Sequence, residues 1–291
     1  MNFTMYAKFH KRVREHGIEE AADYAHSLGF SSVEFIDCAR ADWEMLVPDK
    51  RTAEHFREVL AARSLSVACY SVVANLYEVG MTPDTVTETE RLLKHYAQMA
   101  AALGAPYLHH TLLLGQKRTP ELPLEQALDL ILPAVARVAR YAHALGVTCI
   151  YEDQGEYFNG VSDFGCFFRA IKEECPWVGV CGDVGNVLFV DASPAAFFRA
   201  FAPDILHLHV KDYVSARAPL SETGWDVSKG GVWLKECVVG EGVVDVPTCL
   251  SILKETGYRG AVALENNHEE DFAEGCRSAM RLVEKHLASI D

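Results

Sequence analysis

Several features that mark particular classes of protein are missing from this sequence. No apolar run approaches the roughly 18 residues of a membrane span, and the N-terminus lacks the apolar core of a signal peptide. The nine cysteines are odd in number and form no Cys-x-x-Cys pair. Several of them lie in apolar runs, where a buried thiol behaves as a small hydrophobe. We therefore expect a reducing, cytoplasmic setting and no membrane partner.

Positive charge is also scarce, because 41 acidic residues outnumber 27 basic ones and give a formal net charge of -14. A nucleic-acid binder normally carries a basic stripe that displaces counterions from phosphate. The densest basic group, Lys11-Arg12-Val13-Arg14, opens a predicted helix and is expected to be solvated. No nucleic-acid partner is expected.

Linkers and low-complexity segments are absent from the 291 residues, of which 49% are hydrophobic and 23% charged. Such a composition is typical of a soluble globular protein. A chain of this length buries roughly three quarters of its unfolded surface without needing disulfides. The sequence therefore predicts one domain over residues 1–291.

Short β-branched runs alternate with longer helical patterns along the whole chain. The predicted strands are residues 3–9, 32–38, 66–73, 106–112, 148–153, 178–184, 205–213 and 261–266. The predicted helices are residues 17–28, 52–63, 83–103, 121–145, 161–174, 194–201, 246–256 and 272–288. About eight strand–helix units in series predict an α/β protein with a single (β/α)8 TIM barrel. A doubly wound sheet is the rival, but no Gly-x-Gly-x-x-Gly follows the first or second strand.

The longest irregular stretch, residues 214–245, follows the seventh predicted strand and is rich in Gly, Ser and Trp. A loop this long inside a compact domain is usually functional. We expect it to lie over the mouth of the barrel. A packed insertion without a functional role is the alternative.

Chemically reactive side chains end four consecutive predicted strands. Glu152 ends the fifth strand, Asp183 the sixth, His209 lies near the end of the seventh, and Glu265 near the end of the eighth. Side chains alternate between the two faces of a strand, so His207, His209 and Lys211 are expected to point inward together. Active sites of TIM barrels lie at these carboxyl ends of the strands. Any one of these residues alone is more often a cap, a surface charge or a core histidine.

Three carboxylates that meet at one point repel each other unless they take up protons or bind a cation. Three carboxylates and one imidazole suit Mn²⁺, Mg²⁺ or Co²⁺, with Zn²⁺ as a further option. The predicted cofactor is therefore one divalent metal ion held by Glu152, Asp183, His209 and Glu265.

These residues resemble the pattern of the xylose-isomerase-like TIM-barrel superfamily, which includes ketose 3-epimerases, hydroxypyruvate isomerase, inosose dehydratase and AP endonuclease IV. The resemblance rests on Ile-Tyr-Glu-Asp at 150–153, Gly-Asp-Val-Gly-Asn at 182–186, His-x-His-x-Lys-Asp at 207–212, Leu-Glu-Asn at 264–266 and Gly-x-Gly-x-x-Asp at 240–245. It covers nearly the whole chain. It implies the four ligands given above.

The resemblance implies a metal-dependent isomerase or epimerase of a small keto-sugar or cyclitol. The cation would bind the carbonyl and an adjacent hydroxyl, and Glu152 and Glu265 would remove and return the α proton. His110, Asn186, Lys211 and Arg217 are candidates for substrate contact. No phosphate cradle is evident, which favours a free sugar or cyclitol over a sugar phosphate. Relatives are often dimers or tetramers, so a homo-oligomer is compatible with the resemblance.

Two alternatives stay open. A dehydratase of the inosose dehydratase type abstracts the same proton but expels a β-hydroxyl. A metal-dependent AP endonuclease fits less well, because Asn186 stands where many members have His, and His207 stands where the three-zinc branch has Asp.

Overall fold

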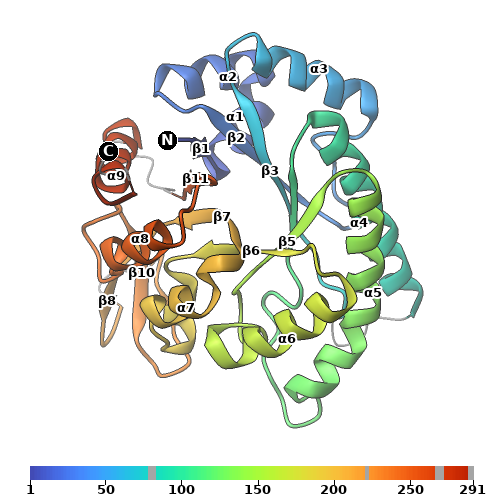
Figure 1. The fold of residues 1–291 in the computed structure, drawn as a ribbon, viewed down its shortest axis with the longest axis vertical. Helices are drawn as coiled ribbons and strands as arrows, with labels where there is room; N and C mark the ends of the chain where they lie inside the picture. The colour runs from blue at the N-terminus through green and yellow to red at the C-terminus, as the bar shows by residue number, and fades with distance from the viewer. Residues whose placement is uncertain (78–82, 220–222, 266–271, 288–291) are drawn as a thin grey trace.

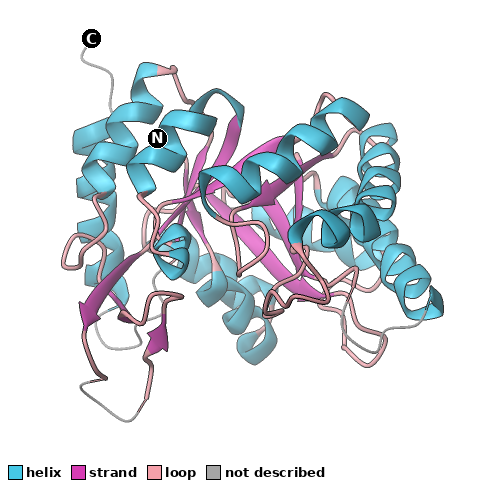
Figure 2. Cartoon of the chain, turned by 90° about the horizontal axis from the view of Figure 1, so that it is seen from below, coloured by secondary structure: helices cyan, strands magenta, loops and turns pink. Residues whose placement is uncertain are grey.

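Eight parallel strands contributed by the whole chain close into a barrel in the computed structural model, which describes residues 1–77, 83–219, 223–265 and 272–287 (Figures 1 and 2). Around the barrel the strands follow their order in the sequence, and the last pairs with the first. The barrel strands are β1 (Phe3–Met5), β2 (Ser32–Cys38), β3 (Ser66–Val73), β4 (Tyr107–His110), β5 (Thr148–Glu152), β6 (Gly179–Asp183), β7 (Ile205–Val210) and β11 (Ala261–Leu264). The predicted single (β/α)8 TIM barrel is confirmed.

Helices surround the barrel and cover the outer face of its strands (Figure 1). They are α1 (Ala7–His16), α2 (Ile18–Ser27), α3 (Lys50–Ala61), α4 (Pro83–Leu103), α5 (Leu124–Ala144), α6 (Gly160–Glu174), α7 (Pro194–Phe201), α8 (Val246–Glu255) and α9 (Phe272–Leu287), with 3-10 turns η1 (Asn186–Val190) and η2 (Ala202–Asp204). Parallel strands covered in this way are buried on both faces, which explains their nearly continuous apolar runs. None of the described helices is long and apolar enough to cross a membrane.

The prediction of a first strand over residues 3–9 is wrong beyond Met5, where β1 ends. Helix α1 begins at Ala7, and its buried residues Phe9 and Val13 are spaced four apart, so they lie on one helical face. The basic group at residues 11–14 therefore lies inside this helix and does not open it. The first nine residues are rich in residues that favour strands. The sequence therefore did not reveal that a short strand is followed, after one residue, by a helix.

The seventh predicted strand, residues 205–213, is in fact two strands that belong to different sheets. Strand β7 ends at Val210, and β8 (Asp212–Ala216) pairs with β10 (Trp233–Cys237) in a small antiparallel sheet that also contains β9 (Asp226–Val227). The stretch 214–245, predicted as a loop, thus carries a sheet beside the barrel (Figure 1).

Asp212 makes this change of direction. Its carboxylate accepts the backbone N–H groups of Tyr213, Gly240, Gly242 and Val244 at 2.8, 2.9, 2.9 and 3.0 Å. A Cβ atom at Gly242 would collide with this carboxylate, so glycine is required there. The Gly-x-Gly-x-x-Asp segment then ends at Asp245, whose side chain accepts the N–H of Thr248 and caps α8. The motif therefore fastens the inserted sheet to the end of β7.

Candidate metal centre

Four neighbouring strands bring the predicted ligands to one end of the barrel. Glu152 and Asp183 are the last residues of β5 and β6, and His209 is the penultimate residue of β7. Glu265 follows β11 directly and continues its pairing, because its backbone N–H donates to the carbonyl of Val210 at 3.0 Å. The parallel direction of all four strands places these residues at the same rim.

His209 lies at the centre of the group. Its Nδ1 is 2.8 Å from Glu152 Oε1 and 4.0 Å from Glu265 Oε2. The donor atoms of Asp183, His209 and Glu265 lie within 4.8 Å of one another. The side chains of Glu152, Asp183 and His209 are almost completely buried, whereas that of Glu265 is 18% exposed. Glu265 therefore forms the open side of the cluster.

Lys211 occupies the space between two of the carboxylates. Its Nζ donates to Glu265 Oε2 at 2.8 Å and lies 3.0 Å from Asp183 Oδ2. The other oxygen of Asp183 accepts the backbone N–H groups of Gly185 and Asn186, both at 2.7 Å. Asp183 Oδ2 receives no hydrogen bond from the described residues, only this ionic contact. Backbone hydrogen bonds thus fix Asp183 through Oδ1, and Oδ2 is available as a ligand for a cation.

The ionisation of the cluster reflects the crowding of charge. Burial, opposed by Lys211 and reinforced by Glu152 and Glu265, raises the pKa of Asp183 to about 6. Burial acts in the same direction on Glu152, but His209, His109 and Lys211 outweigh it and lower its pKa to about 2. Burial would lower the pKa of His209, yet Cys181, Glu34 and Glu152 raise it well above the usual value. One of the carboxyl groups is therefore costly to ionise without an added cation.

These residues fit a divalent cation. Three carboxylates and one imidazole, with Asp183 Oδ2 buried and without a hydrogen bond, form a donor set that suits Mn²⁺, Mg²⁺ or Co²⁺. Glu152, Asp183, His209 and Glu265, which we call the outer tier, would hold the ion. A cation there would replace Lys211 as the balancing charge.

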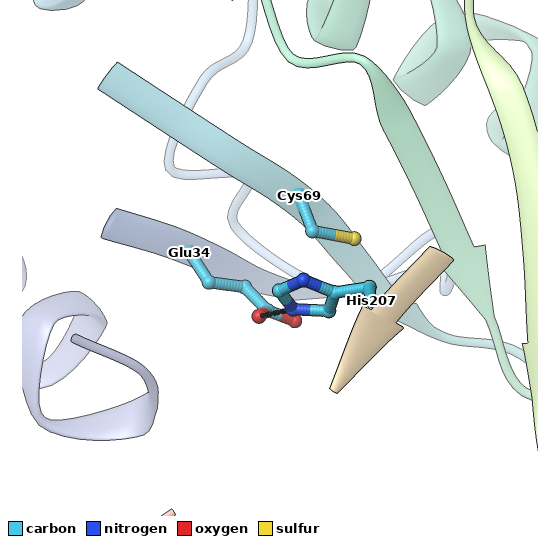
Figure 3. A group of neighbouring side chains, drawn as sticks. All are labelled: Glu34, Cys69 and His207. Carbon is cyan, nitrogen blue, oxygen red and sulfur yellow. Dashed lines mark hydrogen bonds and ion pairs between the residues drawn. The ribbon is translucent and has the colours of Figure 1, made fainter. Parts of the chain in front are cut away.

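A second polar group, which we call the inner tier, lies one layer deeper in the barrel, and of its members only His207 was predicted from the sequence to point inward. It comprises Glu34 of β2, Cys69 and Ser71 of β3, and His207 of β7, all buried. Glu34 Oε2 lies 2.7 Å from His207 Nε2, and Ser71 Oγ donates to Glu34 Oε1 at 2.5 Å. Figure 3 shows the Glu34 carboxylate meeting the His207 ring, with the Cys69 thiol nearby.

The signal for Glu34 was present in the sequence. It lies between the apolar residues Val33 and Phe35 in the predicted strand 32–38, whose other charged residue is Asp37. Because Val33 and Phe35 pack outward in the hydrophobic core, alternation alone turns Glu34 inward.

The two adjacent histidines of β4 lie on opposite sides of the barrel wall. His109 faces the interior, where Nδ1 is 3.1 Å from Ser71 Oγ and Nε2 is 3.8 Å from Glu152 Oε2. His110 packs edge-on against the ring of Tyr151, with centroids 5.2 Å apart, and its Nδ1 meets the carbonyl oxygen of Thr111 at 2.9 Å. Burial lowers the pKa of His110 to about 4. Its position does not support the predicted substrate contact, and His109 is the better candidate.

Of the remaining residues predicted to contact substrate, Asn186 and Lys211 lie at the cluster and Arg217 does not contact it. Asn186 opens η1 beside Asp183, is 8% exposed, and its Nδ2 has no hydrogen-bond partner among the described residues. Arg217 is exposed just beyond β8, and none of the contacts described for it reaches the cluster. The structure therefore places Lys211 and Asn186 in contact with the cluster, and Arg217 is not joined to it by any described contact.

A cavity of about 730 Å³ is lined by Gln154 and Asn186, which hydrogen-bond to Glu152 and Asp183. Its walls come from the loop after β4 (residues 114–117), the loop after β5 (residues 154–156), η1, and the inserted sheet with its turn (residues 226–229). Gln154 links this cavity to the ligands, because its Nε2 donates to Glu152 Oε2 in a short hydrogen bond while its Oε1 has no described partner. The cavity is of a size that binds small organic molecules.

The inserted sheet is held against this cavity by direct bonds. Asp191 accepts Ser228 Oγ at 2.6 Å and the N–H of Gly230 at 2.5 Å, and the N–H of Lys229 donates to the carbonyl of Phe189 at 2.9 Å. The stretch predicted to lie over the barrel mouth therefore forms one wall of the cavity beside it.

The chain matches the family described as xylose isomerase-like TIM barrel over residues 22–286. It belongs to this family. It is also 32% identical over 90 residues to the L-ribulose-5-phosphate 3-epimerase UlaE of Salmonella paratyphi C (strain RKS4594), a match that covers 31% of this chain and 26% of the relative. The chain thus matches only about a quarter of that relative's length.

Solved structures share the fold at low identity. An L-ribulose 3-epimerase superposes with a TM-score of 0.74 at 15% identity, covering 98% of this chain and 96% of its own. A xylose isomerase-like protein from Mycobacterium smegmatis in complex with magnesium gives 0.68 at 18% identity, covering 93% and 89%. At these identities the likeness concerns the fold alone.

Proposed function

We propose that this member of the xylose isomerase-like family is a divalent-metal-dependent isomerase or epimerase of a small keto-sugar or cyclitol. The observation that carries the proposal is the convergence of Glu152, Asp183, His209 and Glu265 at one rim. Nothing in a barrel core requires three acids there, and their burial is costly without a cation. The 3-epimerase to which the chain is similar supports this reaction class.

A bound cation would polarise the substrate carbonyl and stabilise the negative charge that develops when the neighbouring proton leaves. Asp183 and His209 would serve as ligands only. Asp183 is held by two backbone N–H groups, and His209 is enclosed by acids, so neither is free to reach a substrate proton.

The proton transfers fall to Glu152 and Glu265. They come from strands on either side of the pair β6 and β7, so they approach a ligand in the mouth from different directions. One would take the proton α to the carbonyl and the other would return one, which requires their pKa values to differ. Their surroundings differ already, since Glu152 is buried against His209 and Gln154 whereas Glu265 is partly exposed and bonded to Lys211.

The substrate would extend into the 730 Å³ cavity. Asn186 and Gln154 line it, and among the described residues Asn186 Nδ2 is a donor without a partner and Gln154 Oε1 an acceptor without a partner. Such a pair suits the hydroxyl groups of a polyol, which both donate and accept. Lys211, 2.8 Å from Glu265, is placed to contact a substrate oxygen once a cation neutralises the carboxylates.

Proton NMR in D₂O with Mg²⁺ and a panel of L-ribulose, D-allulose, their phosphates and a keto-inositol tests the proposal. We expect deuterium to replace the proton on the carbon next to the carbonyl. No other atom of the substrate should be lost. Loss of water would instead show the dehydratase reaction, which begins with the same proton abstraction. The control is the protein stripped with EDTA, and exchange that continues there would contradict the role of the metal. Three zinc ions per chain by metal analysis would point to the endonuclease reaction.

A further inference from the structure

We propose that Glu34 is a positioning residue for the metal ligand His209. It would accept the Nε2–H of the His209 imidazole and so direct Nδ1 to the cation. The inference rests on the proposed metal site, but it concerns a residue that contacts neither the substrate nor the cation.

The two nitrogens of His209 face different surroundings. Nδ1 points to the outer tier, 2.8 Å from Glu152 Oε1 and 4.0 Å from Glu265 Oε2. Nε2 points to the inner tier and is 3.3 Å from each oxygen of Glu34. A neutral imidazole carries one N–H. When Nδ1 binds a cation, Nε2 must therefore carry the proton, and Glu34 is the acceptor beside it.

Glu34 is itself held in place from two further directions. Ser71 Oγ donates to Oε1 at 2.5 Å, and the Nε2 of His207 lies 2.7 Å from Oε2. The Glu34 side chain is completely buried, so no water competes with these donors. A carboxylate in this position keeps the His209 ring from rotating, because rotation would leave a buried acid without its third donor. Its negative charge also makes Nδ1 a stronger ligand.

A second metal ion in the inner tier is the competing interpretation, because Glu34, Cys69 and His207 bring an O, an S and an N donor within 4.8 Å of one another (Figure 3). The bonds described above favour positioning. Both Glu34 oxygens are already engaged by Ser71, His207 and His209.

Calorimetric titration with Mn²⁺, in the absence of substrate, tests this role. Glu34→Gln should weaken Mn²⁺ binding by roughly 10- to 100-fold, which is the usual cost of losing a ligand's outer partner. The matched control is Glu90→Gln, the same substitution at a largely buried carboxylate of α4 that pairs with Arg137 and Lys94. It should leave Mn²⁺ affinity unchanged. Equal losses in both variants, or no loss in Glu34→Gln, would overturn the inference.

Nitrogen-15 NMR of the histidines in the wild-type protein loaded with Mg²⁺ or Zn²⁺ provides a readout that needs no variant. We expect His209 to bind the ion through Nδ1 and to keep its proton on Nε2. Binding through Nε2 would overturn the inference even if the metal site is real. Wild-type protein that binds no divalent ion would overturn the proposed function as well, and a second bound ion whose ligands include Glu34 would favour the competing interpretation.

Discussion

The inner and outer tiers of the barrel both contain buried acids, but the protein satisfies them differently. Glu34 in the inner tier is surrounded by donors from three side chains, Ser71, His207 and His209. Asp183 in the outer tier leaves Oδ2 without a hydrogen bond, and its pKa is raised by burial and by neighbouring acids. An acid that the fold satisfies by itself can hold other groups in place. An acid that the fold leaves with only an ionic contact to Lys211 is suited to bind a metal cation.

The largest effect should come from removing an outer-tier carboxylate. Glu265→Gln keeps the shape of the side chain but can neither bind the cation as an anion nor transfer a proton. We expect turnover to fall by about 10²–10⁴-fold or more, while thermal unfolding of the metal-free protein changes little because this side chain is partly exposed. Steady-state kinetics and calorimetry measure both. Activity that survives the substitution would contradict the role assigned to Glu265.

An intermediate effect should appear in the pH dependence of metal binding. The pKa of Asp183 rises from 3.8 to about 6 in the folded protein. The cation needs the ionised carboxylate. The affinity for Mn²⁺ should therefore reach its maximum above about pH 6 and fall as the pH drops below that value. Without metal the sign is opposite. The protonated form stabilises the folded state, and this stability is lost as pH rises from 3.8 through about 6.

Titrations with Mn²⁺ between pH 5 and 8 measure the first trend, and thermal melts of the metal-free protein measure the second. Asp183→Asn is the control for the melts, since it removes the group that titrates. If the stability of the metal-free protein instead rises as pH increases from 3.8 to about 6, Asp183 is ionised more easily than its surroundings indicate.

The smallest effect on activity is expected from substitution of His110. Substitution of its neighbour His109 provides the comparison. His109→Asn changes a side chain that faces Glu152 and Ser71, and it should lower kcat/KM by roughly tenfold or more. His110→Phe replaces a ring that packs against Tyr151 outside the barrel interior, and it should alter stability more than kcat/KM. Kinetics of the two variants side by side decide which histidine belongs to the site. A larger loss in His110→Phe would reverse the assignment.

The fold and the outer tier were accessible from the sequence because strand ends carry a strong signal. Glu152 follows the apolar run Cys149-Ile150-Tyr151, His209 lies between Leu208 and Val210, and period-two alternation gives the direction of both side chains. The helix α4 was predicted with its observed bounds, Pro83–Leu103, because a long amphipathic pattern is hard to mistake. The sequence also predicted the long segment after β7, but not its structure.

The misses have physical causes. Alternation was not applied to His109 and His110, which are adjacent in one strand and therefore point to opposite faces of it. Helix α1 follows β1 after a single residue, and no turn signal separates them. The inserted sheet is stabilised by pairing between β8 and β10, which lie far apart in sequence. Such pairing depends on long-range contacts that local patterns do not contain.

The carboxylate of Asp212 separates two parts of the molecule that can vary independently. It binds the backbone on both sides of the inserted segment, at Tyr213 and at Gly240, Gly242 and Val244, and so closes the segment into a loop with a fixed base. Substitutions, insertions or deletions between these anchor points would reshape the cavity wall without displacing β7. The cavity wall can therefore change in sequence while the strand that carries His209 keeps its position.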